Sequence, residues 1–479
     1  MSPSRDSVVT GLQSLMGHDR VATDTETLAK RSLDTWPLPL VQLAMGAQPA
    51  APLCVVRPRS TDEVARVLAH LYRQGVPTVP YGGGSGVLGG AKPGPDSVVL
   101  DLGEMSRILS LDEDNLTVTV QPGVFLGKLE AWLNERGYIT GHYPQSIDVA
   151  QLGGLVATRS AGQFSTKYGN IEDLLVSLEA VLPDGQVMRI KDVPRRATGP
   201  DLRHIWLGSE GAFGVITEVT VKVFPRPVDR WLQAYAVPTM RTGMEVIHRF
   251  LHDGWRPAVV RLHDEIEAER SYASVVNKGE SILLLLSEGP EGYAQAEGRA
   301  LDRTALAAGL HPLGPAPVEA WLEHRNDVHE FEQFIRAGLI VDTIEVSARW
   351  TDIAGIYERV AERLRREVPE LIVVSGHSSH SYPQGTNLYF ILGAQPPRNP
   401  AEVERVYKAI WSRVMETTLA GGGTISHHHG VGKMRAPWMP AELGTSYKVL
   451  ESLKSALDPK GLMNPGTLLP LSGQEPPRP

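Results

Sequence analysis

The chain has 479 residues, of which 42% are hydrophobic and 21% charged, and its formal net charge is −8. This length exceeds what one hydrophobic core supports, so we expect two or three domains. The negative charge argues against a nucleic-acid partner, and the single cysteine, Cys54, excludes an internal disulfide and a cysteine-bound iron–sulfur cluster. The first residues lack the apolar segment of a secretory signal and no stretch of eighteen apolar residues occurs, so we expect no membrane span and a cytoplasmic protein.

The N-terminal arm, residues 1–50, is expected to be helical up to about Leu33 and then to cross the body in extended form through residues 34–39. After a strand that starts near Leu53, Ser60 precedes an apolar spacing that is typical of a capped helix. The further strands expected before the middle of the chain are residues 76–79, 97–101, 116–120 and 174–176, and a strand that ends at Pro225, with a helix from Val124 to Leu133.

A run of glycines from Pro80 to Gly90 follows the expected strand at residues 76–79. Glycines lack a Cβ and let consecutive backbone N–H groups converge on an anion, most often a phosphate. A Walker loop would continue with Lys-Ser/Thr and a Rossmann turn with a helix, but Pro93 and Pro95 break any helix within one turn. The pyrophosphate of a nucleotide would therefore lie against loop amides. A mobile glycine linker is the alternative.

A second set of small and hydroxyl-bearing residues occupies 141–146 and 152–162, where a flat ring and a ribityl chain could approach the backbone closely. Residues 168–173 and 209–217 each lead into an apolar strand. Taken singly, each segment is a tight turn of an α/β domain. Their order in one chain favours a cofactor site instead.

With these motifs the chain resembles the flavin-binding oxidases and transferases related to vanillyl-alcohol oxidase, over about residues 50–470. The resemblance implies an α+β protein with a two-subdomain α/β FAD-binding domain at residues 51–227. It further implies an α+β cap at 228–425 and a C-terminal segment at 426–479 that returns to the flavin. The FAD is expected to be non-covalent, because covalent members often use a histidine in the glycine loop and residues 80–90 contain none.

The resemblance also implies which residues hold the FAD, mostly glycines and hydroxyl-bearing side chains of the ordered motifs. They are Pro80, Tyr81, Gly82, Gly83, Gly84, Ser85, Gly86, Pro144, Ser146, Gly153, Gly154, Thr158, Ser160, Gly162, Tyr168, Gly169, Ile216, His427 and Asn464.

Within this family, residues 158–162, 168–173 and 426–433 look most like the alkyldihydroxyacetonephosphate synthases, which use FAD to exchange an acyl ester for an alkyl ether. We therefore expect an enzyme of that type that acts through flavin N5 on a small hydroxy or keto substrate. D-lactate and glycolate dehydrogenases share the fold and are the first alternative; a non-catalytic flavoprotein subunit is the second. A second copy of the chain, in a homodimer, is the one macromolecular partner considered.

Three consecutive histidines, His427 to His429, suggest a metal site. Neighbouring residues of an extended segment point to opposite faces and cannot all meet one ion, so we expect no metal. Glycines on both sides favour a strand end that carries imidazoles over a flat ligand. Histidine titrates near neutrality, so His428 and His429 are expected to move protons or to orient a substrate phosphate.

Two other side chains are candidates for the chemistry. By resemblance, Tyr389 matches the tyrosine that the ether-lipid synthases place beside the flavin for proton transfer, with Tyr382 less well placed; a core tyrosine in an apolar strand is the alternative. Arg261 lies between apolar neighbours, where a guanidinium needs a carboxylate or phosphate. It is expected either at the cap side of the active site or in a structural ion pair.

One position departs from the ether-lipid synthases. Residues 341–346 resemble a strand of those enzymes, and counting back from it places their phosphate-binding arginine on Phe331, which cannot hold a phosphate. Either Arg325 or Arg336 takes over that role, or the substrate is not the phosphorylated ketone; a slipped register is the alternative. We expect a carboxylate or an unphosphorylated hydroxy compound to bind better.

Overall fold

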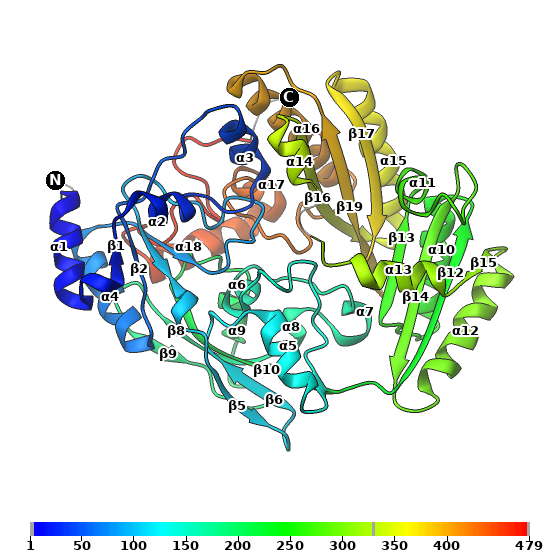
Figure 1. The fold of residues 1–479 in the computed structure, drawn as a ribbon, viewed down its shortest axis with the longest axis horizontal. Helices are drawn as coiled ribbons and strands as arrows, with labels where there is room; N and C mark the ends of the chain where they lie inside the picture. Colours follow the sequence, from blue (N-terminus) through cyan, green and yellow to red (C-terminus); the bar gives the residue numbers. More distant parts are fainter. Residues whose placement is uncertain (1–3, 328–330, 477–479) are drawn as a thin grey trace.

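The structure, a computed structural model, describes residues 4–327 and 331–476. In Figure 1 the N-terminal half lies at the left and below, and a large sheet with its helices lies at the right. The C-terminal residues, in red, return to the left and lie beside the N-terminal elements. Among the described residues, no helix combines the length and the apolar composition needed to cross a bilayer.

The first sheet has the strand order β1-β2-β4-β3, with β2 and β3 parallel to β4. Ser60 accepts a hydrogen bond from the N–H of Glu63 and so caps α4, and Gly75 ends this helix in the left-handed conformation. The elements of this part are α1 (Arg5–Met16), β1 (Val21–Ala22), α2 (Thr25–Lys30), α3 (Pro37–Ala44), β2 (Cys54–Val56), α4 (Thr61–Gln74), β3 (Thr78–Tyr81) and β4 (Val98–Asp101). The expected β-α-β unit is confirmed, and β3 ends at the glycine loop.

The N-terminal arm differs from the expectation. Residues 37–39 do not cross in extended form but begin α3, because a proline is tolerated in the first turn of a helix. The residues just before α3 lie over the glycine loop, where Leu33 O accepts from the hydroxyl of Tyr81 at 2.8 Å and the N–H of Thr35 donates to Gly86 O at 2.9 Å. The arm therefore fixes the loop from outside.

The second sheet is antiparallel, with the order β5-β6-β10-β8-β9. Strand β5 was not expected, since most of its side chains are exposed and give no core signal. The elements are β5 (Ile108–Asp112), β6 (Thr117–Val120), α5 (Leu126–Asn134), β7 (Tyr138–Ile139), α6 (Leu152–Ala157), α7 (Ser165–Tyr168), α8 (Ile171–Leu174), β8 (Leu175–Val181), β9 (Val187–Arg189), α9 (Arg203–Trp206), β10 (Val215–Lys222) and β11 (Phe224–Pro225).

The third sheet runs β15-β12-β14-β13-β17-β19-β16, with β18 paired to β19, and all its pairs are antiparallel. The apolar runs at residues 282–286 and 387–392 lie in strands of this sheet, and residues 351–367 lie in a helix. The elements are β12 (Asp229–Val237), α10 (Met240–His252), β13 (Val259–His263), α11 (Glu265–Tyr272), β14 (Ser281–Gly289), α12 (Tyr293–Ala307), β15 (His311–Gly314), α13 (Ala316–His324), α14 (Glu332–Arg336), β16 (Ile340–Arg349), α15 (Trp350–Glu367), β17 (Leu371–Ser378), β18 (Ser381–Tyr382), β19 (Gly385–Ala394) and α16 (Pro400–Ala420).

Both faces of this third sheet are covered, and the alternation along each strand decides what each face carries. In β19, Leu388, Phe390 and Leu392 belong to the core formed with the helices. Because successive side chains point to opposite faces, Tyr389 points away from those helices. The same period places Arg261 of β13, Thr343 and Glu345 of β16 and His377 of β17 on the face of Tyr389.

The last segment leaves α16 and runs without a strand of its own to α17 (Met439–Leu443) and α18 (Tyr447–Leu457). Beyond α18 it rejoins the first sheet, where the N–H of Thr78 donates to Leu462 O at 2.9 Å. The histidine run lies in the strandless part, so the expected strand end is wrong.

Candidate active site

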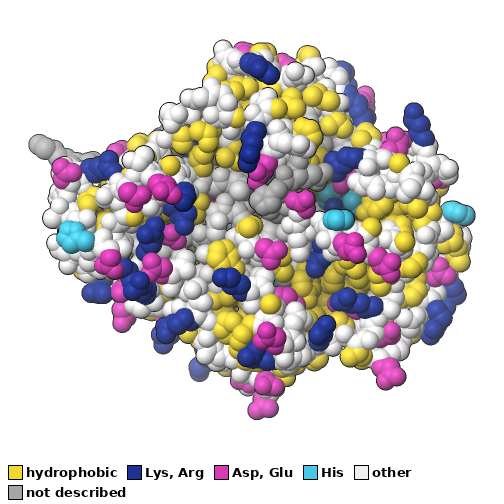
Figure 2. All heavy atoms as spheres, viewed as in Figure 1, with side chains coloured by type: hydrophobic (Ala, Val, Ile, Leu, Met, Phe, Trp, Pro, Cys, Tyr) yellow, Lys and Arg dark blue, Asp and Glu magenta, His cyan; other side chains and the backbone are white. Residues whose placement is uncertain are grey.

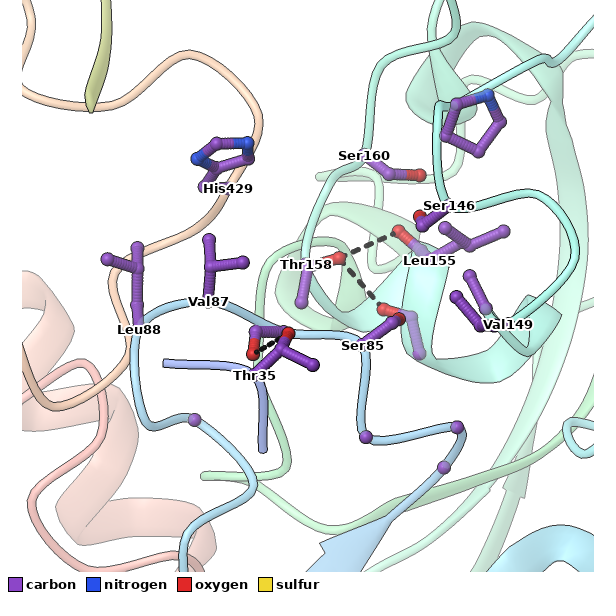
Figure 3. A pocket seen from close by; sticks show the side chains of 18 of the residues that line it. Thr35, Ser85, Val87, Leu88, Ser146, Val149, Leu155, Thr158, Ser160 and His429 are labelled. Atoms are coloured by element: carbon purple, nitrogen blue, oxygen red, sulfur yellow. Dashed lines mark hydrogen bonds between the residues drawn. The ribbon is translucent and has the colours of Figure 1, made fainter. Parts of the chain in front are cut away.

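A cavity of about 590 Å³ lies where the glycine loop, the second sheet, the third sheet and the C-terminal segment meet. In Figure 3 the glycine loop carries Ser85 and Val87, while His429 and Ser160 lie above it in the view, at the left and the right, on different segments. The space-filling view in Figure 2 shows side chains of both charges interspersed on this face, without a broad basic area among the described residues.

The glycine loop forms a cradle at this cavity. Among the described residues, the backbone N–H groups of residues 82–87 donate no hydrogen bond. A Cβ on Gly83 would lie 2.0 Å from the carbonyl oxygen of Val149, and one on Gly84 would lie 2.2 Å from the hydroxyl oxygen of Tyr81. Free amides in a loop whose Gly83 and Gly84 leave no room for a side chain suit a bound pyrophosphate, so the residues present fit the phosphate part of FAD.

Most of the residues expected to hold FAD line this cavity. They are Pro80, Tyr81, Gly82, Gly83, Gly84, Ser85, Gly86, Pro144, Ser146, Gly153, Gly154, Thr158, Ser160 and Ile216. All four catalytic candidates, Arg261, Tyr389, His428 and His429, line it as well.

Five of the expected residues lie behind the cavity wall. Tyr168 donates its hydroxyl to Glu288, and Gly169 takes a positive φ at the end of α7. Gly162 leaves room for the backbone of Tyr143, whose nitrogen a Cβ would meet at 2.5 Å. The remaining two, His427 and Asn464, contact neighbouring loops, and Asn464 donates to the carbonyl oxygens of Gly90 and Glu210. The structure places these five as supports of the wall.

The histidine run is shaped by one buried carboxylate. Glu345, fully buried on β16, accepts hydrogen bonds from the N–H groups of His427, His428 and His429 at 3.1, 2.9 and 2.7 Å. Arg435 is also fully buried and forms an ion pair with Glu345. The chain thus wraps around the carboxylate instead of extending.

This wrapping brings neighbouring imidazoles together, so the argument that they must point to opposite faces is wrong. The Nδ1 atoms of His427 and His428 are 2.9 Å apart, and the ring of His380 is stacked on His427 and meets His428 edge-on. Nitrogens of these three residues lie within 4.8 Å of one another. The expectation that the chain binds no metal stays a prediction.

Replacement of Arg435 by methionine is expected to lower the free energy of unfolding by about 3–5 kcal/mol, because Glu345 would then keep its charge in the interior without a partner. Burial alone would raise the pKa of Glu345, but the charge of Arg435 is the largest opposing effect and the pKa is lowered to about 2, so the carboxylate stays ionised. Urea denaturation measures the loss. Arg336→Met is the matched control, since Arg336 forms an exposed pair with Glu332 worth about 1 kcal/mol or less. Equal losses in both variants would contradict the role given to Arg435.

A second carboxylate holds the same segment from the other side. Glu210 accepts from the N–H groups of Val431 and Gly432 at 2.6 and 2.8 Å, and its side chain also lines the cavity. Burial raises the pKa of Glu210 to about 7, against the lowering effect of these two N–H groups. Glu210 is therefore a titratable group that holds the C-terminal segment by two hydrogen bonds.

Because the pKa of Glu210 is raised above its unfolded value, its contribution to stability is present below about pH 4.5 and is lost as the pH rises through about 7. A shift of this size corresponds to about 3 kcal/mol. Melting curves between pH 5 and 8 should show a steeper loss of stability with rising pH in the wild type than in Glu210→Gln. The variants are compared by this slope and not by absolute stability. In Glu210→Gln the NH2 of the amide faces one of the two backbone N–H groups, and that repulsion acts at every pH. Identical slopes would contradict the prediction.

Tyr389 lies among the imidazoles of the cavity. Its hydroxyl donates to Thr343 at 3.0 Å and lies 3.5 Å from Nε2 of His429. The ring of His428 is stacked on it at 5.9 Å, and the ring of His377 at 4.7 Å. The tyrosine is therefore part of the wall of the cavity.

The protonation states of these groups follow from their burial. Burial, followed by the neighbouring His429, lowers the pKa of His428 well below its ordinary value, and burial also lowers that of His429. Burial raises the pKa of Tyr389, although its bond to Thr343 opposes the rise. Burial therefore favours neutral histidines that accept and a protonated tyrosine that donates, and the proton-transfer role of His428 and His429 stays a prediction.

Two family models match the chain. The FAD binding domain matches residues 52–191, and the C-terminal domain of FAD linked oxidases matches residues 227–468. The chain belongs to the FAD-linked oxidase family. Within it, the chain has the FAD-binding fold of vanillyl-alcohol oxidase and the cap domain that accompanies it. FAD is the cofactor.

Relatives of this FAD-linked oxidase cover nearly its whole length. The uncharacterized FAD-linked oxidoreductase YgcU of Escherichia coli O157:H7 is 40% identical over 98% of this chain and 100% of its own. An alkyldihydroxyacetonephosphate synthase of Caenorhabditis elegans is 30% identical over 91% of this chain and 79% of its own. A solved structure of an alkyldihydroxyacetonephosphate synthase has a TM-score of 0.81 at 24% identity, over 97% of this chain and 85% of that one.

Phe331 of this FAD-linked oxidase lines the cavity beside Ile335, where the resemblance would place an arginine. Arg336 points to solvent, with 80% of its side chain exposed, and pairs with Glu332. Arg325 donates to Gln163 and packs against the rings of Tyr143, Phe164 and Trp321, and it does not line the cavity. Neither arginine takes the place of one at Phe331.

Four further residues of the FAD-linked oxidase site escaped the sequence analysis: Glu210, Glu345, His377 and Arg435. Alternation along residues 341–346 contains a usable signal, because it places Glu345 opposite the apolar Ile344 and Val346. Arg435 offers no such signal, because its partner Glu345 is 90 residues away in the chain.

Proposed function

We propose that this FAD-linked oxidoreductase oxidises a small hydroxy compound that carries one carboxylate. One observation supports this proposal above all. Among the described residues that line the cavity, Arg261 is the single lysine or arginine, and Phe331 and Ile335 form apolar wall. A guanidinium binds a carboxylate through two parallel hydrogen bonds, whereas a dianionic phosphate is usually met by more than one cation.

The residues of the chain have separate roles in this proposal. Arg261 binds the carboxylate and orients the substrate. A neutral imidazole, of His428 or His429, accepts the proton of the substrate hydroxyl, and the hydroxyl group of Tyr389 donates to the oxygen that becomes the carbonyl. FAD, when bound, supplies the acceptor for the hydride that leaves the substrate carbon. Neutral histidines suit this role because a protonated imidazole could not take up the proton.

Non-covalent attachment of FAD is part of the proposal. Cys54, the one cysteine, is buried in β2, and residues 80–90 offer no histidine. Heat or acid is therefore expected to release free FAD from the purified yellow protein, and absorbance of the supernatant measures it. Flavin that stays in the precipitate would overturn this point.

The proposal predicts that oxalate, a dicarboxylate probe, perturbs the absorbance of bound FAD at lower concentration than glycerol 3-phosphate does. The difference rests on Arg261, whose charge-assisted hydrogen bonds are worth about 1.5–3 kcal/mol each. Acyl-dihydroxyacetone phosphate should likewise be a poor ligand. Tight binding of that ester, with fatty-alcohol exchange that survives Arg325→Ala and Arg336→Ala, would overturn the proposal.

Ether-bond formation is the second candidate. The position of Tyr389 beside His428 and His429 favours it, because the resemblance implies a proton-transfer tyrosine beside the flavin in the ether-lipid synthases, whose motifs the histidine run also resembles. Incubation of the holoenzyme with acyl-dihydroxyacetone phosphate and a labelled fatty alcohol tests it, and labelled ether product would favour it over oxidation. A flavoprotein without catalysis would show neither product formation nor flavin reduction.

A further inference from the structure

Arg261 and three side chains behind it contact one another in a cycle. We call these four residues the Arg261 ring: Arg261, His263, Glu267 and His377. Arg261 donates from Nε to Nε2 of His263 at 2.9 Å, and its Nη2 lies 3.1 Å from Nε2 of His377. Both imidazoles turn their Nδ1 atoms to the carboxylate of Glu267, at 3.1 Å for His263 and 3.0 Å for His377. The guanidinium is thereby held from behind by two rings.

The fold fixes the members of the Arg261 ring independently of any ligand. His263 and His377 are paired neighbours on β13 and β17. Glu267 lies in the first turn of α11, where Asp264 accepts from its N–H and also from the N–H of Gly376. The two histidines and Glu267 are each at most 5% exposed.

Hydrogen bonding fixes the protonation states of the ring. Glu267, an ionised carboxylate, accepts from Nδ1 of His377, and Nε2 of His263 accepts from Nε of Arg261, so both histidines carry their proton on Nδ1. Nδ1 of His263 lies 3.1 Å from Glu267 in a contact that lacks hydrogen-bond geometry. Burial lowers the pKa of His263, and burial together with Arg261 lowers that of His377 to about 4. Against the effect of burial, the two histidines hold the pKa of Glu267 well below its ordinary value. The ring therefore contains one cation, one anion and two neutral imidazoles.

A metal ion is the competing interpretation, because ligand atoms of His263, Glu267 and His377 lie within 4.8 Å of one another. An ion bound by the two Nδ1 atoms would move both protons to Nε2. Each Nε2–H would then face an N–H of Arg261, and two donors would oppose each other at about 3 Å. The observed contacts favour the hydrogen-bonded ring.

We infer that Glu267 is a positioning residue: through the two imidazoles it holds the guanidinium of Arg261 at the cavity, where a substrate carboxylate is bound. His377 also helps to position Tyr389, because the two rings are stacked. The inference rests on the proposed function for the identity of the bound anion. The tautomers of His263 and His377 are independent of it.

Titration of the holoenzyme with oxalate, followed by the absorbance of bound FAD, measures the effect. Glu267→Gln is expected to weaken oxalate binding roughly tenfold to a hundredfold, and Arg261→Ala at least as much, while both retain FAD. Glu265→Gln is the control, since this residue lies on the same helix outside the ring. Unchanged oxalate binding in Glu267→Gln, with Arg261→Ala impaired, would overturn the positioning role and leave the proposed function standing.

Nitrogen-15 NMR of the histidine rings gives a readout that requires no ligand. His263 and His377, assigned by single substitution, should show the neutral Nδ1–H pattern between pH 6 and 9, and Glu267→Gln should abolish it in at least one ring. If the wild type binds no oxalate, the proposed function fails, and this spectrum still decides for or against the ring. An Nε2–H pattern, or one equivalent of metal that is lost in Glu267→Gln, would overturn it.

Discussion

Gly83→Ala is expected to give a folded protein that contains almost no FAD. The new Cβ would lie 2.0 Å from the carbonyl oxygen of Val149, a backbone atom that cannot turn away as a side chain can. Either the glycine loop or residues 149–150 must move, and the free amides of residues 82–87 would then no longer converge. The ratio of flavin to protein absorbance after purification in excess FAD measures the loss.

Gly94→Ala is the matched control for this prediction. Gly94 follows the same loop, and a Cβ there would make an ordinary contact of 3.4 Å with the hydroxyl oxygen of Ser97. Circular dichroism separates loss of FAD from loss of fold. Gly84→Asp should also abolish loading, since its φ is +71° and a carboxylate in the nest repels the pyrophosphate. Full FAD content in Gly83→Ala would contradict the assignment of the cradle.

Tyr389→Phe and His428→Ala are each expected to retain FAD and to lose about a hundredfold or more in turnover. The tyrosine is the protonated donor that lies among the imidazoles, and His428 is a neutral acceptor whose ring is stacked on it. Loss of the tyrosine hydroxyl leaves the cavity shape nearly intact, whereas loss of the His428 ring also enlarges the cavity, and each change removes a proton position. Single-turnover reduction of the flavin by the substrate measures the rate without the reoxidation step.

Tyr235→Phe provides the control for this pair. Tyr235 lies on β12 of the same sheet, and its buried hydroxyl donates to Asp302 at 2.7 Å, away from the cavity. This variant loses one buried hydrogen bond and about 1 kcal/mol of stability, with no change in turnover. Near-normal rates in both Tyr389→Phe and His428→Ala would show that these side chains are structural.

The glycine loop and the histidine run could be located from the sequence because their chemistry is local. Consecutive glycines without a following helix indicate an anion nest, whatever the rest of the chain does. Tyr389 was found only through the resemblance to the ether-lipid synthases, because an apolar strand equally suits a core tyrosine. In the structure, the alternation of Leu388, Tyr389 and Phe390 separates the tyrosine from the helix-facing core.

What the sequence could not supply was the pairing of distant charges. Glu345 looks like one of several polar residues in a strand, and only the fold shows that three backbone amides and Arg435 converge on it. Glu267 depends in the same way on two strands that bring His263 and His377 together. The wrapped histidine run follows from Glu345, so its shape could not be read from its own residues.

The measurement that tests the central claim most directly is anaerobic mixing of the holoenzyme with small 2-hydroxy acids. The account predicts that at least one of them bleaches the flavin absorbance, and that Arg261→Ala raises the concentration required. A phosphorylated ketone or glycerol 3-phosphate should leave the flavin oxidised. Flavin that stays oxidised with every 2-hydroxy acid, together with exchange of a fatty alcohol into acyl-dihydroxyacetone phosphate, would contradict the account.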